Sequence, residues 1–547
     1  MKAKLLAVAV AAATLGACGG GDDNATTGGA TTPTTPATPT TKISGTAATG
    51  AALAGATVQA KCATGSGSAT TAADGTFTLE IPNAVRPCVL SVQVPNGPVM
   101  HSIVDAGSGT AAVANITPLT ELVTAAIAGG STTDFFSTFD AAAQGKLTSD
   151  GVTSAVSAVS LTLSGIVDLG GVNPISDTLV AATGGTAGNA MDQAIDKLGA
   201  AMAASGTTLE NLSTAVAANP GGNSTGPIQT ILQPSAATCA GFRSGKYFSV
   251  NTADNMIEPV TVDAAKLTVT YQSDGAVDTL TADSSQACRF VNPDSQYGYD
   301  MVVGKAGVAL LRDVRGSTTS ARLLVPAQKV PADQKVGEWV GLTYATTSTS
   351  AGKLVPSRVN LTLAAGNKAT AGTRCYAGSS PCYVFTDADL PVFTEDANGL
   401  SSTQSSSGQG YSISFVGTDG RVSMFTTRPG GFSVYSKAYT MTLPTVGSTS
   451  SYWDSSLNYT GAMSTFDAYS NRIDSVDTTA KSYTRTRIED GRVDTWTINN
   501  PVVGLRHRDA ATGVNETIGL RIPALGLSVS IAANVAQNFF SLSMDRP

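Results

Sequence analysis

Side chains able to perform acid–base chemistry near neutral pH are scarce in this sequence. Its 547 residues include two histidines, His101 and His507, so a zinc site built from several histidines is excluded. His101 lies in the strand-like segment VMHSIV, and we expect it to be a buried core or rim residue. His507 lies between Arg506 and Arg508, a basic setting that disfavours its protonation, and we expect it in a surface loop. A catalytic triad would have to recruit one of these two histidines as its base.

Recognisable catalytic and metal-binding motifs are also missing. No Gly-x-Ser-x-Gly signature lies between a predicted strand and helix, as a serine hydrolase requires. Residues 240–247 approximate a phosphate-binding loop, but Tyr247 replaces the magnesium-binding hydroxyl and the segment precedes a strand. Acidic residues gather at 387–399 without the spacing of a calcium-binding EF-hand loop. We predict no catalytic residue, no metal site and no cofactor, although the fold could still assemble the paired carboxylates of a glycoside hydrolase.

Composition and charge limit the function classes further. Lys and Arg number 33 against 40 Asp and Glu, a formal net charge of −7, so no basic surplus is available for a nucleic-acid partner. The hydrophobic fraction of 42% supports real cores and excludes wholesale disorder. What remains is an exported, β-rich protein with several domains.

The first residues have the pattern of an export signal. Lys2 and Lys4 precede an apolar run that ends at Leu15 and is too short to span a bilayer. The run continues into Leu15-Gly16-Ala17-Cys18, which resembles the bacterial lipobox. That resemblance implies a lipoprotein signal peptide at 1–17 and acylation of Cys18, whose acyl chains would hold the protein to a membrane. An ordinary signal peptide with an accidental cysteine is the alternative.

The residue after Cys18 bears on localisation. It is Gly19 rather than Asp, which resembles the pattern of Gram-negative lipoproteins sorted to the outer membrane. We therefore expect a lipid-anchored protein of the bacterial cell envelope. The sequence leaves open whether its body faces the periplasm or the cell surface.

The six cysteines that follow Cys18 are expected to form disulfides in an oxidising compartment. Fifteen connectivities are open, and sequential pairing is the most economical because each pair then falls within one apparent domain. Metal thiolates are disfavoured because no Cys-x-x-Cys occurs. The expected bonds are Cys62–Cys88, Cys239–Cys288 and Cys375–Cys382.

The N-terminal half divides into segments that differ in composition and in the spacing of their hydrophobic residues. Residues 18–41 are rich in Thr and Pro and are interpreted as a spacer. In residues 42–116, hydrophobic and polar residues alternate, as they do in short, half-buried strands. Within them, Gly45, Gly55-Ala56-x-Val58 and Asp74-Gly75-x-Phe77 resemble the carboxypeptidase regulatory-like domain. The resemblance implies an Ig-type β-sandwich that serves as a spacer or binding module without catalysis.

In the rest of the chain, the spacing of hydrophobic residues changes twice. Residues 117–219 follow a helical period and predict a small helical domain, which Thr117-Pro118 begins and in which Thr207 and Glu210 form a capping box. A linker is expected at 220–236. From 237 to 547 the period returns to two, with Asp-Gly and Asn-Gly pairs at hairpin turns. This region predicts an antiparallel β-barrel-like or sandwich domain, either one unit or two split near residue 330, so the fold class is multidomain and mainly β.

One motif in the C-terminal region suggests a ligand. Gly337-x-Trp339 at the start of a strand resembles the first-strand motif of lipocalins, in which the Trp closes the floor of a barrel that holds a small apolar ligand. The resemblance makes Trp339 a candidate ligand-binding residue, although the later Thr-Asp-Tyr motif of lipocalins is not evident. Trp339, Trp453 and Trp496 could instead form a stacking platform for sugars or belong to the sheet core.

The order of lipobox, spacer, β-module, helices and cysteine-paired β-domain resembles that of uncharacterised lipoproteins from Gram-negative, especially betaproteobacterial, genomes. The segment Asn115–Glu121 is its most distinctive piece. We hypothesise a membrane-anchored, non-enzymatic envelope lipoprotein that binds or adheres to a glycan, a protein or a small ligand. The alternatives are a lipocalin-like carrier of a small apolar ligand and a hydrolase of an extracellular polymer.

Overall fold

The computed structural model describes most of the chain after the expected spacer. The described residues are 40–164, 166–182, 186–219, 226–294, 296–377, 381–406, 408–417, 419–534 and 537–547. The expected signal peptide, Cys18 and nearly all of the spacer lie outside them. The fold is multidomain and mainly β, as predicted.

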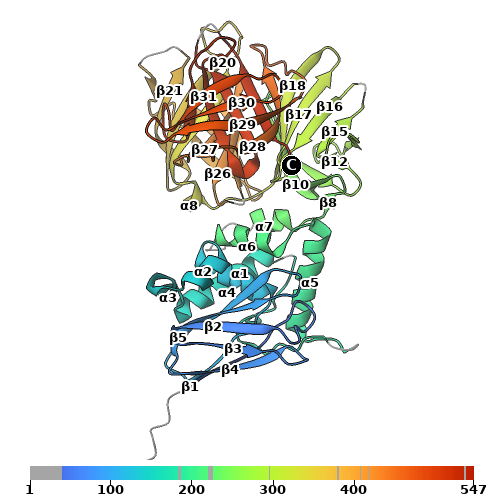
Figure 1. Cartoon of the computed structure of the whole chain (residues 1–547). Helices are drawn as coiled ribbons and strands as arrows, with labels where there is room; N and C mark the ends of the chain where they lie inside the picture. The colour runs from blue at the N-terminus through green and yellow to red at the C-terminus, as the bar shows by residue number, and fades with distance from the viewer. Residues whose placement is uncertain are drawn as a thin grey trace, which may run out of the picture. The chain divides into compact units, whose positions relative to one another are not determined.

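Two sheets form the N-terminal β-module (Figure 1). One sheet has the order β4-β1-β7 and the other β3-β2-β5-β6, with β1 and β7 parallel. Strict alternation on β4 buries Phe77, Leu79 and Ile81 on one face while its other face stays exposed. The strands are β1 (Thr40–Thr46), β2 (Thr57–Thr64), β3 (Ser66–Thr70), β4 (Thr76–Pro82), β5 (Val85–Gln93), β6 (Val99–Val104) and β7 (Ala111–Val113).

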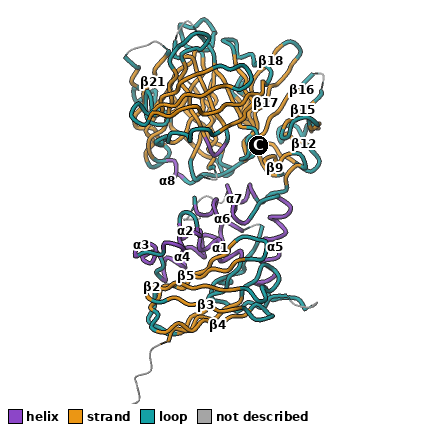
Figure 2. The backbone as a smooth tube through the Cα atoms, in the orientation of Figure 1, coloured by secondary structure: helices purple, strands orange, loops and turns teal. Residues whose placement is uncertain are grey.

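Helices follow the β-module and share its core. Helix α1 begins after Thr117, whose side chain accepts a hydrogen bond from the Thr120 backbone amide, with Pro118 in the first turn. It packs on β6, and α2 packs on β5 and β6. Figure 2 shows these helices next to the strands of the module. One continuous hydrophobic cluster joins helices and strands. The helices are α1 (Pro118–Ala128), α2 (Thr132–Thr138), α3 (Ala141–Lys146), α4 (Ser149–Leu163), α5 (Ala190–Ser205), α6 (Leu209–Ala217) and α7 (Gly226–Ile231).

The first C-terminal sheet is open and antiparallel. Its nine strands follow the order β13-β12-β11-β10-β18-β17-β16-β15-β14, and β8 and β9 form a separate two-stranded sheet. The separate pair is β8 (Ser235–Ala236) and β9 (Cys239–Arg243). The strands of the sheet are β10 (Gly245–Asn251), β11 (Met256–Asp263), β12 (Thr268–Tyr271), β13 (Val277–Thr279), β14 (Thr281–Ala282), β15 (Arg289–Asn292), β16 (Gly298–Val303), β17 (Ala309–Arg315) and β18 (Thr318–Pro326).

The second C-terminal sheet closes on itself. Its order is β20-β19-β27-β26-β25-β24-β23-β21-β22, and the further pairing of β20 with β21 closes the ring, with β22 attached to β21. The short helix α8 (Ala332–Lys335) precedes it. Its strands are β19 (Gly337–Ala345), β20 (Val355–Ala364), β21 (Lys368–Tyr376), β22 (Tyr383–Val384), β23 (Val392–Glu395), β24 (Leu400–Ser405), β25 (Gly408–Val416), β26 (Val422–Arg428) and β27 (Gly431–Lys437).

The third sheet is a closed eight-stranded barrel, called the C-terminal barrel below, whose first four strands carry labels in Figure 1. The described strands of this region thus form three large sheets and the small β8–β9 pair. The barrel consists of β28 (Thr449–Leu457), β29 (Asp467–Asp477), β30 (Ser482–Arg487), β31 (Val493–Ile498), β32 (Leu505–Arg508), β33 (Thr517–Ile522), β34 (Leu527–Ala532) and β35 (Phe540–Asp545), with a short 3-10 turn at Pro523–Leu525.

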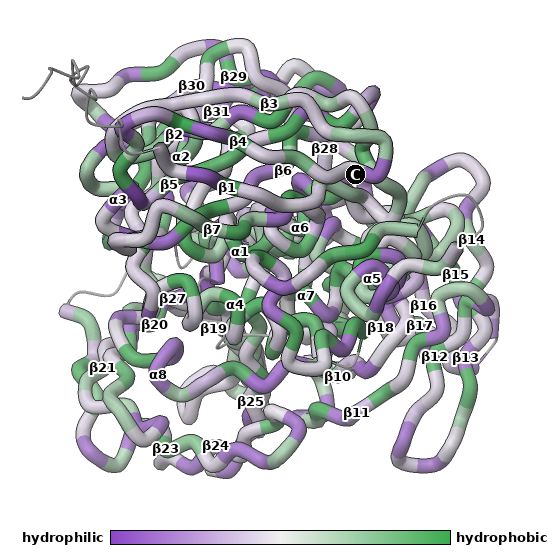
Figure 3. Tube along the Cα trace, turned by 90° about the horizontal axis from the view of Figure 1, so that it is seen from below, coloured by the Kyte–Doolittle hydropathy of each residue, from purple (hydrophilic) through white to green (hydrophobic). Residues whose placement is uncertain are grey.

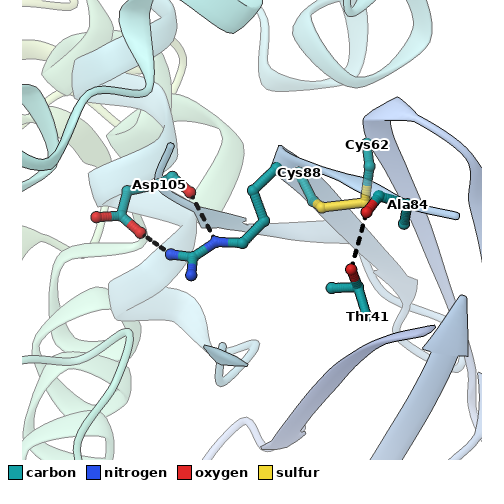
Figure 4. Close-up of a disulfide and its surroundings, with 6 residues drawn as sticks. Thr41, Cys62, Ala84, Cys88 and Asp105 are labelled. Carbon is teal, nitrogen blue, oxygen red and sulfur yellow. Dashed lines mark hydrogen bonds and ion pairs between the residues drawn. A yellow bond between two sulfur atoms is a disulfide. The ribbon is translucent and has the colours of Figure 1, made fainter. Parts of the chain in front are cut away.

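The predicted sequential disulfides are confirmed. Cys62–Cys88, Cys239–Cys288 and Cys375–Cys382 are all bonded. Cys62 and Cys88 face each other in register on β2 and β5, and Thr41 binds the Ala84 carbonyl beside them (Figure 4). Among the described residues, no helix combines the length and apolar character that crossing a bilayer requires.

Candidate ligand-binding site in the C-terminal barrel

The C-terminal barrel has a polar interior and an apolar outer wall on its closing strands. Tyr452, Asp454 and Ser456 of β28 line the interior, whereas Trp453 and Leu457 point outward and are buried. Alternation of this kind sends successive side chains to opposite faces of a strand, and hydrophilic and hydrophobic residues alternate along the strands in Figure 3. Strand β28 therefore turns its polar side chains into the barrel and its apolar side chains outward.

Packing against neighbouring sheets accounts for the apolar outer wall. The ring of Phe540 on β35 lies 5.4 Å from that of Tyr344 on β19 and 4.9 Å from that of Phe432 on β27. Residues of all three C-terminal sheets belong to the same hydrophobic cluster. The large core thus lies between the sheets, whereas the cavity-lining residues Met441, Tyr483, Trp496 and Ile498 form a smaller apolar cluster.

Two adjoining cavities occupy this interior. Their volumes are about 360 and 350 Å³, within the range of small-molecule sites. Both are lined by Ser450, Asn471, Arg485, Arg506 and Arg521. The shared residues make the two cavities parts of one space, which is called the lumen below.

The lumen is rich in arginine. Five arginines of the barrel line it, against the aspartates Asp454 and Asp545 at the cavity wall and Asp494 buried behind it. With all three carboxylates ionised, five guanidinium groups leave a surplus of two positive charges. The five are Arg485, Arg492, Arg506, Arg508 and Arg521.

Asp494 is the shared counter-ion of three of these arginines. Its carboxylate oxygens lie 2.7 Å from Arg485 Nε, 3.1 Å from Arg508 Nη1 and 3.3 Å from Arg492 Nη2. The Trp496 indole N–H also donates to it, at 2.8 Å. Burial opposes ionisation of Asp494, but the arginines outweigh it and hold its pKa below the ordinary value.

Arg506 differs from the other four because it forms no close ion pair with a described carboxylate; Asp545, which pairs with Arg521, interacts with its charge only from a greater distance. Among the described residues, no carboxylate oxygen lies within 4.0 Å of its guanidinium, although its exposed fraction is 7%. Its Nη1 donates to the Tyr483 hydroxyl at 2.8 Å, its charge lies 4.3 Å from the centre of the Trp496 ring, and its Nε has no hydrogen-bond partner. A buried cation in this state is costly unless something else neutralises it.

Burial also shifts the pKa of other charged groups in the lumen, and their hydrogen-bond and ion-pair partners oppose the shift. Burial raises the pKa of Asp454, while Ser541 and Ser543 oppose this by donating hydrogen bonds to its Oδ1 at 2.8 and 2.6 Å. Burial lowers the pKa of Arg508 to about 10, even though Asp494 favours its charged form. Burial likewise raises the pKa of Asp545, which pairs with Arg521 at 3.1 Å.

Comparisons with known proteins assign no family. No known family matches the chain, and no curated protein is similar to it. A solved structure of a protein of unknown function, from the DUF3598 family of Nostoc punctiforme PCC 73102, is 13% identical and aligns over 39% of this chain and 97% of its own. Its TM-score is 0.15, too low to indicate a shared fold.

His507 departs from its expected setting. It lies on strand β32 rather than in a loop, and its side chain is 18% exposed on the outside of the barrel. Its ring nitrogens lie 3.3 Å from Asp509 and 3.1 Å from Glu516. The expected basic surroundings are wrong because alternation sends Arg506 and Arg508 into the lumen, on the opposite face.

His101 is buried, as expected, and forms no triad. Its Nδ1 lies 2.9 Å from Glu121 Oε2, and its Nε2 has no hydrogen-bond partner. Thr132 and Ser213 donate to the other oxygen of Glu121 at 2.6 and 3.3 Å. The serine thus contacts the carboxylate instead of the imidazole, the reverse of the order in a serine-hydrolase triad.

Trp339 lies in the packed interior of the second sheet, at 1% exposure. Its indole N–H donates to the Lys335 carbonyl at 2.8 Å, and Leu361 and Tyr435 belong to the same cluster. The neighbouring cavity measures about 70 Å³ and is not lined by Trp339. This volume is far below that of a typical ligand site, so the structure gives Trp339 a core role.

Sequence reasoning missed the lumen arginines. Arg485, Arg506 and Arg508 were visible as cations on strand-like segments, and Ser528, Ser530, Ser541 and Ser543 as alternating serines. Polar alternation of this kind on several strands is the signal that could have found them. This alternation identifies a site only when the closed barrel brings the polar faces of its strands together.

Proposed function

We propose that this chain is a non-enzymatic ligand-binding protein of the bacterial cell envelope, with the ligand held in the lumen of the C-terminal barrel. The observation that carries the proposal is the lumen itself, two adjoining cavities of about 360 and 350 Å³ lined by polar side chains. A site of this size with convergent polar groups is the usual setting for a small molecule.

The polarity of the lumen favours a polar ligand over the apolar one considered from the lipocalin resemblance. Serine hydroxyls, guanidinium groups and the amide of Asn471 line its wall. An apolar ligand would displace water from these groups without replacing its hydrogen bonds. A polar ligand can satisfy them, so we place binding here and not beside Trp339.

Binding is favoured over hydrolysis by the state of the carboxylates. Asp494, whose pKa is held low by its arginines although burial opposes this, has its oxygens committed to three cations and does not line either cavity. It is therefore poorly placed to attack a bound substrate. Asp454 accepts hydrogen bonds from Ser541 and Ser543, and Asp545 pairs with Arg521, so both carboxylates already have partners within the barrel.

Occlusion of the lumen tests this proposal. Ser530 on β34 is one of the serines that line the cavity of about 350 Å³. The indole of Ser530→Trp is expected to fill that cavity. The full chain would be screened by thermal shift against sugars, organic acids and amino acids, because a ligand at 100 times its Kd stabilises by about 2.7 kcal/mol. We expect at least one class of polar compound to raise the Tm of the wild type and not that of Ser530→Trp.

The matched control is Ser475→Trp, an exposed position on β29 of the same barrel. It should respond to the compound as the wild type does. Equal responses in Ser530→Trp and wild type, or no response to any compound in the wild type, would contradict binding in the lumen.

The envelope location forms the second half of the proposal and is supported by the lipobox-like segment before Cys18. Metabolic labelling with palmitate should label the wild type and Gly21→Ser, a neighbouring control, but not Cys18→Ser. The reason is that the acyl chains require the cysteine thiol and not the residues after it. Label retained on Cys18→Ser would refute the anchor.

A further inference from the structure

The charge of the lumen narrows the class of ligand that it can hold. We propose that the ligand is a small hydroxylated oxyanion, such as a sugar acid or a sugar phosphate, and that Arg506 binds its anionic group. This inference rests on the proposed function, since it names the ligand class of the same lumen.

The first support is the uneven distribution of counter-ions. Asp494 serves three arginines and Asp545 serves Arg521, at 3.1 Å. Arg421, which reaches the rim of one cavity from outside the barrel, lies 3.6 Å from Asp419. Arg506 is thus the lumen arginine without an ion-pair partner among the described residues, and it lines both cavities.

The second support is the set of polar atoms that lack partners. Arg506 Nε and Arg492 Nε are buried donors without a hydrogen bond, and Asn471 Oδ1 is a buried acceptor without one. Asn471 is 3% exposed and lines both cavities. The polar groups around the lumen therefore outnumber their protein partners, and a molecule that carries both oxyanion oxygens and hydroxyls fits this surplus of donors and acceptors.

The third support is the rigidity of the Arg506 side chain. Its guanidinium lies 4.3 Å from the Trp496 ring centre and donates to the Tyr483 hydroxyl at 2.8 Å. These two contacts hold the planar group without neutralising its charge. A pre-positioned guanidinium can bind a carboxylate or phosphate with paired hydrogen bonds at little entropic cost.

Calorimetric titration of the full chain provides the test. The probes are galacturonate and glucose 6-phosphate, with galactose and glucose as their neutral counterparts. At least one anion is expected to bind the wild type at least about tenfold more tightly than its neutral counterpart, because a charge-assisted hydrogen bond is lost with the charge. Galacturonate binding identifies a carboxylate ligand and glucose 6-phosphate binding a phosphate, and either supports the inference.

Variants then locate the anionic group. Arg506→Gln should weaken anion binding about tenfold to a hundredfold. Arg472→Gln removes the same charge from an exposed position of the same barrel, where the side chain is 58% exposed, and should change binding by less than about twofold. Arg506→Lys keeps the charge without the planar fork, so it should bind with intermediate affinity and provides a second variant if Arg506→Gln does not fold.

Outcomes separate this inference from the function on which it rests. Neutral sugars that bind as tightly as the anions, or anion binding that survives Arg506→Gln, would overturn the oxyanion class while leaving a lumen ligand in place. If only uncharged or cationic compounds bind and Ser530→Trp abolishes their binding, the oxyanion class is likewise overturned and a lumen ligand remains. If no compound of any charge binds in the lumen, both proposals fail.

Discussion

Asp494→Ala is expected to destabilise the C-terminal barrel by about 3–5 kcal/mol, the usual cost of removing one partner from a buried ionic cluster. The carboxylate is 2% exposed and neutralises Arg485, Arg492 and Arg508 together. Without it, three guanidinium groups would share a poorly hydrated space and repel one another. Urea unfolding followed by tryptophan fluorescence would measure the loss, since Trp453 and Trp496 belong to this barrel.

The control for this substitution is Asp490→Ala, in the turn after β30. Asp490 forms an ion pair with Arg487, but its side chain is 44% exposed, and exposed pairs contribute at most about 1 kcal/mol. A loss in Asp494→Ala no greater than in Asp490→Ala would show that Asp494 is not the counter-ion we describe.

Acid provides an independent check on the same residue. Burial opposes its ionisation, yet the arginines hold the pKa of Asp494 below its ordinary value of 3.8. The folded chain therefore binds fewer protons at this site than the unfolded chain does. The stability that Asp494 contributes is present above pH 3.8 and is lost as the pH falls through the lower folded pKa, so Asp494→Ala should remove this part of the acid dependence.

Removal of the Cys239–Cys288 bond is expected to cost about 4 kcal/mol, because the loop that it closes spans 49 residues and the entropy lost by the unfolded chain grows with loop length. Both cysteines are buried, so the double substitution to alanine avoids placing hydroxyls in the core. Urea unfolding of the oxidised chain and of the variant would measure the difference.

The matched control is the Cys375–Cys382 bond, which closes a loop of 7 residues. On the same reasoning, its double alanine variant should lose only about 2–2.5 kcal/mol. If the short loop costs as much as the long one, loop closure is not the main source of the stabilisation.

Local patterns in the sequence were sufficient for much of the fold. Thr117-Pro118 marked the start of α1 because capping and the fixed φ of proline act within one turn. Sequential cysteine pairing was correct: Cys62 and Cys88 lie opposite each other on β2 and β5, and the Cys239–Cys288 bond joins β9 to the residue before β15. The capping box expected at Thr207 was wrong by one residue, since Thr208 caps α6 and Thr207 donates to the Ile231 carbonyl instead.

The lumen could not be predicted in the same way. Alternation shows that a strand has two faces, but it does not say which face a closed barrel turns inward. That choice depends on long-range pairing, as of β28 with β35, where Asp454 lies opposite Ser543. Among the described residues, the lack of a close ion pair at Arg506 arises only after the eight strands of the barrel have placed their carboxylates. For the same reason, the two arginines that flank His507 in the sequence did not predict the groups that surround its side chain.

The apolar outer wall of the C-terminal barrel has an evolutionary consequence. Phe540, Leu542 and Met544 are each fully buried by residues outside the lumen. Were the barrel transplanted alone into another protein, these side chains would face water and invite self-association. Recombination should therefore move the three C-terminal sheets together as one inherited block, even though only the last of them encloses the arginine-lined space.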